Sequence, residues 1–255
     1  MTRQKFAFLM NDKPESAPVR EALVERYGHV DPEQADVIVA IGGDGFMLEV
    51  LRQHMGGQTP VYGVNCGTVG FLMNAQDFDG LADNIATAEE AIIHPLAMEA
   101  ETADGRIEIA KAINEVSLFR QTRQSAKIRI SVNGRERMGS LTCDGVLLST
   151  PAGSTAYNLS AHGPILPINA QLLALTPISA FRPRRWRGAL LPHDAVVTFE
   201  TMTPEFRPVS AVADNAEVRN VVRVTAKEDR SVAMRVLFDR GHSLDERILR
   251  EQFNY

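Results

Sequence analysis

The sequence predicts an α/β protein with two domains, an N-terminal domain built on a parallel sheet and a C-terminal domain that is mostly β. Over residues 1–90, short apolar runs alternate with segments of helical period, which is typical of a parallel sheet covered by helices. After Pro95 the pattern changes to period-two alternation and hairpin turns. The 255 residues are enough for two modest domains. We place the boundary near residue 95.

Apolar spacing predicts the elements of the N-terminal domain. The run Val37-Ile-Val-Ala-Ile41 is too apolar for a strand with one wet face, so it suits a strand covered on both sides. Gly28 stands where a preceding helix would end. We expect strands at residues 5–10, 36–41 and 60–65, helices at residues 14–27 and 77–90, and a further helix directly after the glycines at 42–45.

The C-terminal domain is expected to consist mainly of strands. Apolar and polar residues alternate over 128–132 and lead into Asn133-Gly134, a strong hairpin signal. Residues 243–250 return to a helical period, and we expect this helix to pack back against the first domain. The predicted domains are residues 1–95 joined by 240–255, and residues 96–239. Further strands are expected at residues 106–112, 145–149, 195–200, 218–225 and 231–237.

Composition favours a cytoplasmic globular protein. The chain is 44% hydrophobic and 23% charged, and no apolar run approaches the roughly 20 residues of a membrane helix. Near the N-terminus the apolar stretch at residues 6–10 is too short for a signal peptide. The net charge of −5 argues against a general nucleic-acid binder, and two cysteines, Cys66 and Cys143, fit a reducing compartment. We therefore expect neither a membrane nor a nucleic-acid partner.

The first chemical signal is Gly42-Gly43-Asp44-Gly45, at the carboxyl end of a predicted buried strand, where open α/β sheets place ligands. Gly42, Gly43 and Gly45 let backbone N–H groups approach phosphate oxygens, and a helix start adds a favourable partial charge. A carboxylate repels phosphates, so Asp44 fits a group that accepts a proton from a nucleophilic hydroxyl or holds a divalent cation. The alternative is a tight turn in which Asp44 makes a local hydrogen bond.

Two better-known phosphate motifs are absent from the sequence. The chain contains no G-x-x-x-x-G-K-[ST] loop, and Leu48 stands where the third glycine of G-x-G-x-x-G would fall. The sequence therefore supports neither a P-loop nucleotidase nor an ordinary hydride-transferring dinucleotide enzyme.

The second signal is the segment at residues 143–164, CDGVLLSTPAGSTAYNLSAHGP. A helix is expected to start near Ser154, with its first N–H groups unpaired and available. Small residues in the turn would admit a ligand, and hydroxyls and an amide follow, which favours a polar, hydroxyl-rich or amide-bearing group. The alternative is a capped helix whose hydroxyls bond its own backbone. The small residues are Ala152, Gly153 and Ala156, and the polar ones are Thr155, Tyr157, Asn158 and Ser160.

Three further features carry weaker signals. Asn114-Glu115 opens an apolar run and suits contacts to base or ribose edges, although by itself such a pair is more often a simple turn. The basic cluster at residues 182–187 (RPRRWR) could reach a nucleotide phosphate, from this chain or from a neighbouring subunit, but a solvated face or an interface is the commoner role. His94 and His162 have no metal-ligand partner at suitable spacing, so we expect structural roles for both.

Together these segments resemble the NAD kinase family, of the bacterial type. The resemblance lies in the GGDG turn, in Asn114-Glu115 and above all in residues 144–160, and it extends to residues 67–72 (GTVGFL). It implies ATP-dependent phosphorylation of the adenosine ribose 2′-hydroxyl of NAD, giving NADP. The implied fold is an N-terminal Rossmann-like α/β domain and a C-terminal β-rich, β-sandwich-like domain, with the dinucleotide held between them.

The resemblance also implies roles for individual residues. Asp44 would be the general base on the 2′-hydroxyl, with Gly45 and Phe71 lining the same cleft. Asp214 departs from the Asp-Gly pattern that family members often show, because Asn215 follows it, but a hairpin turn there would still offer Asp214 to the site. Asn114 and Glu115 would contact the adenosine half, and the nicotinamide and adenine ends would contact Asp144, Ala152, Thr155, Ala156, Tyr157, Asn158, Leu159 and Ser160.

The implied cofactor is a divalent cation, Mg²⁺, bound mainly through nucleotide phosphates. The implied partners are NAD and either ATP or polyphosphate, with the chain assembled as a homodimer or homotetramer. Two alternatives stay open. One is a lipid kinase that shares the GGDG turn and would need an apolar cleft, and the other is a non-catalytic dinucleotide-binding sensor. Nothing in the sequence fixes the choice of donor or whether NADH is accepted.

Overall fold

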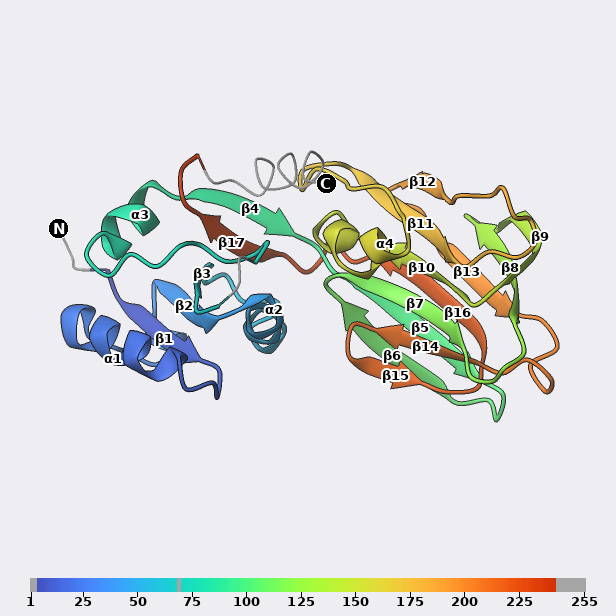
Figure 1. Ribbon diagram of the computed structural model, residues 1–255, viewed down its shortest axis with the longest axis horizontal. Helices are drawn as coiled ribbons and strands as arrows, with labels where there is room; N and C mark the ends of the chain where they lie inside the picture. The colour runs from blue at the N-terminus through green and yellow to red at the C-terminus, as the bar shows by residue number, and fades with distance from the viewer. Residues whose placement is uncertain (1–3, 68–69, 242–255) are drawn as a thin grey trace. The chain divides into compact units, whose positions relative to one another are not determined.

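The computed structural model describes residues 4–67 and 70–241, and the chain divides into two compact units (Figure 1). The first unit comprises Met1–Ile93 and the described residues from Val232 onward, and the second unit is His94–Ser231. Within 4–67 and 70–241, no helix is both long and apolar enough to cross a membrane.

The first unit is built on one five-stranded sheet. Its strands lie in the order β1-β2-β3-β17-β4, and the first four run parallel, whereas β4 is antiparallel to β17. All six residues of β2 are buried, as the sequence predicts for a strand covered on both faces. The bounds are β1 Phe6–Met10, β2 Val37–Gly42, β3 Val61–Asn65, β17 Met234–Phe238 and β4 Glu89–Ile93.

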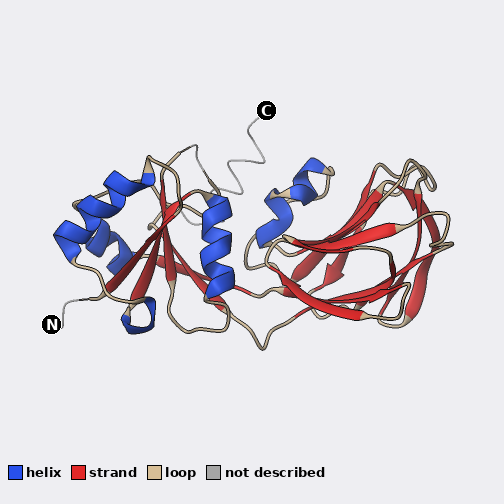
Figure 2. Ribbon diagram, turned by 90° about the horizontal axis from the view of Figure 1, so that it is seen from below, coloured by secondary structure: helices blue, strands red, loops and turns tan. Residues whose placement is uncertain are grey.

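Helices cover both faces of this sheet (Figure 2). α1 (Ser16–Tyr27) and α3 (Leu81–Thr87) pack in one apolar cluster with Val37, Val39 and Ile41 of β2. Successive strand residues point to opposite faces, so the alternate residues of β2 lie on the other face, where α2 (Asp44–Gln53) contacts the strand. A short 3₁₀ turn, η1 (Pro32–Gln34), precedes β2.

The second unit is a sandwich of two antiparallel six-stranded sheets, which confirms the predicted fold class. One sheet has the order β12-β11-β10-β7-β14-β15, with bounds Ala189–Pro192, Leu172–Ile178, Gly145–Ser149, Glu115–Arg120, Val209–Ala213 and Ala216–Val218. The other has the order β6-β5-β16-β13-β8-β9, with bounds Ile107–Ala112, Leu96–Thr102, Val221–Glu228, Val197–Thr201, Ala126–Val132 and Arg135–Cys143.

Buried side chains from both sheets form one core in this unit. Val116 and Leu118 of β7 belong to the same cluster as Ile130 of β8 and Phe199 of β13. The predicted hairpin is present, because β8 and β9 pair across Asn133 and Gly134, whose φ values are 52° and 71°. Two positive φ angles in a two-residue turn match the right-handed twist of the flanking strands.

Three expectations about elements differ from the structure or lie outside it. We expected residues 231–237 in the C-terminal domain, but β17 pairs with β3 and β4 in the first sheet, so the chain returns to the first unit before residue 240. Its consecutive buried residues Val236, Leu237 and Phe238 suit a strand covered on both faces. The helix expected at 77–90 is shorter, because α3 ends at Thr87 and β4 follows. The helix expected at 243–250 lies outside the described residues.

Candidate active site

The GGDG turn joins the end of β2 to the start of α2. Gly42 is the last residue of β2, and Asp44 is the first residue of the helix. A Cβ atom at Gly42 would lie 2.9 Å from Asn11 Nδ2 and 3.1 Å from Phe46 Cβ, so packing requires glycine there. By contrast, a Cβ at Gly43 or Gly45 would have no described atom within 4 Å. These two positions therefore leave the backbone at the helix start open to a ligand.

The Asp44 carboxylate is held in a fixed position by two backbone donors. Phe71 N–H donates to Asp44 Oδ2 at 2.7 Å, and Leu72 N–H donates to Asp44 Oδ1 at 2.9 Å. A Cβ at Gly70 would lie only 2.3 Å from Asp44 Oδ1, so the backbone can approach the carboxylate only because residue 70 is glycine. Each oxygen keeps a second lone-pair direction for a further donor.

A pocket of about 180 Å³ opens beside this carboxylate. It lies where the parallel strands β1, β2 and β3 end, the usual ligand position in an open α/β sheet. Its lining thus comes from three separate segments of the first unit: Asn11 and Lys13, then Gly43 and Asp44, then Asn65, Cys66, Gly67 and Gly70.

In the second unit, the Asp214 carboxylate organises the backbone at Asn114 and Glu115. Asp214 lies in the two-residue turn between β14 and β15, with a φ of 50°, as the predicted hairpin requires. Its oxygens accept N–H groups from Ile113, Asn114 and Glu115 at 2.7, 3.0 and 3.3 Å. Asp214 is therefore directed at the start of β7, where the two predicted contact residues lie.

Burial, together with the nearby charge of Asp214, raises the pKa of the Glu115 carboxyl from 4.5 to about 7. Its Oε2 atom is buried and has no hydrogen-bond partner among the described residues. Glu115 is thus a carboxyl that changes its protonation state near neutral pH, next to a carboxylate whose position is fixed.

The polar segment after β10 divides into an interior part and an accessible part. Asn158 is fully buried, and its Nδ2 atom donates to Ser154 O at 3.0 Å and to Pro164 O at 2.8 Å. Its Oδ1 atom accepts a hydrogen bond from the Thr176 hydroxyl at 2.7 Å. Tyr157 is 38% exposed. Thr155, Ala156, Leu159 and Ser160 also reach the surface in part, whereas Ala152 is buried.

The expected open helix start at Ser154 is absent from the structure. A 3₁₀ turn, η2 (Ala152–Thr155), is followed by the short helix α4 (Tyr157–Ser160). Gly153 N–H donates to Thr150 Oγ1, and Ser154 N–H donates to Pro151 O. The small buried turn thus satisfies its own backbone donors. A Cβ at Gly153 would lie 2.2 Å from Asn114 O, so this glycine serves packing against Asn114 rather than ligand approach.

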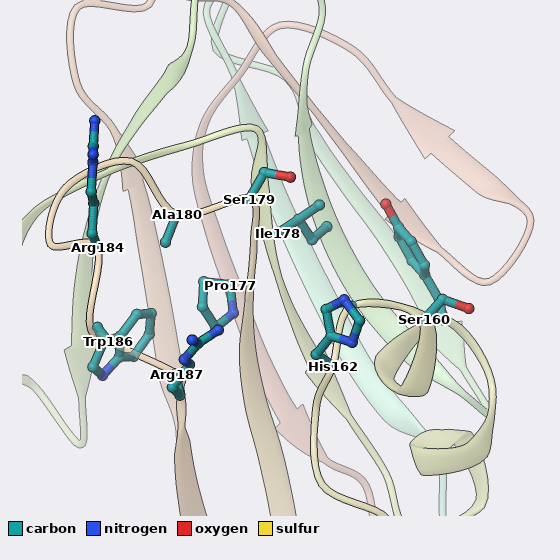
Figure 3. A pocket seen from close by; sticks show the side chains of 11 residues that line it. Ser160, His162, Pro177, Ile178, Ser179, Ala180, Arg184, Trp186 and Arg187 are labelled. Carbon is teal, nitrogen blue, oxygen red and sulfur yellow. The ribbon is translucent and has the colours of Figure 1, made fainter. Parts of the chain in front are cut away.

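Of these accessible residues, Tyr157 and Ser160 line a second pocket, of about 300 Å³. Figure 3 shows Arg184, Trp186 and Arg187 on the opposite side of this pocket from Ser160 and His162. Pro177, Ile178, Ser179 and Ala180 at the end of β11 complete the lining with Tyr157 and Ala161. Part of the basic cluster thus shares a pocket with predicted binding residues, and His162 lines it too, which spacing alone did not indicate.

Asp144 does not lie with Asn114 and Glu115 along the sheet. It precedes β10 and forms an ion pair with Arg120, whereas Glu115 pairs with Ser149 at the other end of β10. Both carboxylates nevertheless act on Tyr157, because burial, Glu115 and Asp144 together raise the pKa of its hydroxyl. Tyr157 therefore links these two predicted positions electrostatically.

The described residues contain no cluster of three His, Cys, Asp or Glu side chains arranged to hold a metal ion. Cys66 and Cys143 are both buried free thiols, and burial raises the pKa of each, that of Cys143 to about 12. A raised pKa keeps both thiols protonated, whereas the reactive form of cysteine is the thiolate.

Comparison with known proteins assigns both parts of the chain to one family. Residues 1–95 match the model of the ATP-NAD kinase N-terminal domain, and residues 113–198 match that of the ATP-NAD kinase C-terminal domain. An NAD kinase of Caulobacter vibrioides is 62% identical over 98% of this chain and 96% of its own length. An NAD kinase of Hyphomonas neptunium is 58% identical over the whole of both chains.

Solved structures agree on the fold. A yeast NADH kinase in complex with NADH superimposes with a TM-score of 0.83 at 21% identity, covering 98% of this chain and 88% of that one. An NAD kinase from Archaeoglobus fulgidus in complex with ATP gives a TM-score of 0.75 at 22% identity, covering 93% of this chain and 95% of that one. With family models over both domains and close relatives over the full length, the chain belongs to the ATP-NAD kinase family of phosphotransferases.

Proposed function

We propose that this protein transfers the terminal phosphoryl group of ATP to the adenosine ribose 2′-hydroxyl of NAD, producing NADP. The observation that carries this proposal is the Asp44 carboxylate, fixed by the N–H groups of Phe71 and Leu72 beside the pocket at the open glycine turn. It supports the proposal because a carboxylate that can accept a proton and backbone donors at a helix start are the two functions that phosphoryl transfer to an alcohol requires.

Asp44 acts as the general base in this mechanism. A ribose hydroxyl is too weakly acidic to attack phosphorus unaided, so its proton must leave as the new P–O bond forms. The remaining lone pair on either Asp44 oxygen accepts that proton, while the two N–H bonds hold the carboxylate in one orientation. Gly43 and Gly45 present the open backbone that contacts the phosphates of the donor, whereas Gly42 is the closely packed residue before them.

Magnesium accompanies the donor as its phosphate complex. Among the described residues, Asp44 is the carboxylate that lines the pocket, and it would be the protein's ligand to an ion carried mainly by phosphate oxygens. When bound, such an ion neutralises the charge that develops on the phosphates. The protein's own contribution is to orient the donor and to receive the proton.

The second unit binds the dinucleotide acceptor. Asn114 and Glu115 contact ribose or base edges at the start of β7, and Tyr157, Ser160 and their neighbours line the larger pocket. The aromatic ring of Tyr157 suits stacking on a base, and the arginines opposite suit the pyrophosphate. The yeast relative of the same fold was solved with NADH and the archaeal relative with ATP, which supports nucleotides as ligands for this fold.

A donor and acceptor panel on the purified protein tests the proposal. NAD and NADH are each offered with ATP or polyphosphate in the presence of Mg²⁺, and NADP or NADPH is measured directly. NADP formation excludes a non-catalytic sensor, and an otherwise silent panel with phosphorylation of diacylglycerol would instead favour a lipid kinase. Sedimentation of the same sample tests the predicted homodimer or homotetramer.

Asp44→Asn tests the assignment of the base. We expect kcat to fall by about 10²- to 10⁴-fold, with NAD binding within several-fold of the wild type, because the substitution removes the proton acceptor and keeps the size. Asp12→Asn, an exposed aspartate on the neighbouring loop, is the matched control and should retain full activity. Full turnover by Asp44→Asn would refute the general-base role.

A further inference from the structure

The loop after β1 brings two further side chains to the pocket beside Asp44. Asn11 and Lys13 line this pocket together with Gly43 and Asp44, although neither belongs to the glycine turn. Asn11 is anchored to the end of β2, because its backbone N–H donates to Ile41 O at 3.2 Å. The loop therefore forms a third wall of the pocket.

Hydrogen bonds within the loop fix the orientation of the Asn11 amide. Its Oδ1 atom accepts the Lys13 backbone N–H at 3.2 Å and the Ser16 hydroxyl at 2.7 Å. Since a backbone N–H can only donate, the atom that faces Lys13 must be the amide oxygen. The Nδ2 atom is consequently turned the other way, toward Gly42, where a Cβ would lie 2.9 Å from it.

This arrangement leaves Asn11 Nδ2 as a donor with no protein acceptor among the described residues. Ser16, which holds the amide oxygen, is fully buried at the start of α1, so the orientation is set by the packed part of the unit. An oriented donor that the chain itself does not use is available to an acceptor that enters the pocket.

Lys13 supplies the positive charge that the rest of the pocket lining lacks. It is the one cationic residue in the pocket lining, and Asp44 is the one anionic residue. Within the described part of the chain, Lys13 forms no ion pair, and its side chain is exposed. An unpaired ammonium, an oriented amide donor and an open helix start together favour an anion with several oxygens.

We propose that Asn11 Nδ2 and Lys13 Nζ bind the terminal phosphates of the phosphoryl donor. This inference rests on the proposed function and assigns it two donor-binding residues. During transfer, the bond from the acceptor oxygen to the terminal phosphorus forms, and the bond from that phosphorus to the bridging oxygen breaks. The hydroxyl proton moves to Asp44, the leaving phosphate gains negative charge, and Lys13 stabilises that charge.

The contacts involve the phosphoanhydride chain and not the nucleoside, so they apply equally to ATP and inorganic polyphosphate. Comparing ATP with polyphosphate as the phosphoryl donor distinguishes this proposal from a contact between Lys13 and adenosine. If Lys13 binds the phosphates, a substitution there weakens both donors to a similar degree. If it weakens ATP alone, Lys13 contacts the nucleoside, and the proposal is wrong.

Lys13→Met removes the charge and keeps the length of the side chain. Loss of one charge-assisted contact should raise the KM for the donor by about 10- to 100-fold and leave the KM for NAD within twofold. Lys5→Met, at the opposite end of β1 and also exposed, is the matched control and should behave as the wild type. A Lys13→Met variant with the donor KM of the control would overturn the proposal.

Asn11→Asp provides a second variant that keeps the shape. The carboxylate still accepts the hydrogen bonds from the Lys13 N–H and the Ser16 hydroxyl. Its second oxygen, however, places negative charge where the Nδ2 amide lay. The affinity for the phosphoryl donor should therefore fall further than in Lys13→Met. Binding of tripolyphosphate, measured by calorimetry without any acceptor, reports on the same contact independently of turnover. Equal tripolyphosphate affinity in wild type and both variants contradicts the proposal even if the protein proves inactive toward NAD.

Discussion

The buried carboxyl of Glu115 makes the stability of the second unit depend on pH. Its pKa of about 7 lies above the ordinary value of 4.5, so the folded state binds more protons than the unfolded state between these two values. The stability that neutral Glu115 contributes is complete below pH 4.5 and is lost as the pH rises through 7. The full difference corresponds to about 3 kcal/mol, of which about 2 kcal/mol falls between pH 5.5 and 8.0.

Glu115→Gln isolates this effect because glutamine keeps the shape and does not titrate. Urea unfolding at pH 5.5 and 8.0 should show that the wild type loses about 2 kcal/mol more than Glu115→Gln over this interval. Trp186, the single tryptophan of the chain, lies in the second unit and reports on its unfolding by fluorescence. Glu108→Gln, at an exposed position on β6, is the control. Parallel pH dependences for wild type and Glu115→Gln would refute the reasoning.

Two further predictions test the geometry around the candidate site residues of each unit. In Gly70→Ala the new methyl would lie 2.3 Å from Asp44 Oδ1, so the carboxylate must move, and kcat measured with NAD and ATP should fall about 10²-fold. Unchanged kcat would show that the carboxylate position is unimportant. In Asn158→Ala the loss of three buried hydrogen bonds should cost about 2 to 4 kcal/mol in the free energy of unfolding, against less than about 0.5 kcal/mol for the exposed control Gln171→Ala. A stable Asn158→Ala protein would instead argue for a role at the ligand.

Elements that carry a local pattern could be predicted from the sequence. The apolar run of β2, the spacing of α1 and the Asn133-Gly134 hairpin depend on residues within one segment, and the structure places each as expected. For β17, the local pattern predicts a strand but not the sheet to which it belongs. Its partners β3 and β4 lie far earlier in the chain. Pairing over such a separation is set by the packing of the whole unit.

The same difference between local patterns and distant partners explains which site residues the sequence predicts correctly. The GGDG turn was found because its chemistry is contained in four consecutive residues. The interior role of Asn158 and the fixing of Asn114 by Asp214 were not, because the hydrogen-bond partners come from 18 and 100 residues away. Hydroxyls and amides in a motif indicate a polar environment, but they do not indicate whether the ligand or the protein supplies their partners.

Asn11 illustrates this ambiguity in reverse. No motif marks it, since an asparagine after a strand is common in turns, and its amide oxygen does form the local bonds that such a turn uses. Those bonds satisfy only half of the side chain. The other half is directed at the first glycine of the turn, where the chain offers it no acceptor among the described residues. Hydrogen bonds to the Asn11 oxygen fix the orientation of the side chain and leave its Nδ2 donor unused inside the pocket. Such a donor indicates a ligand more strongly than a polar composition does, because only the acceptor of its hydrogen bond is still to be supplied.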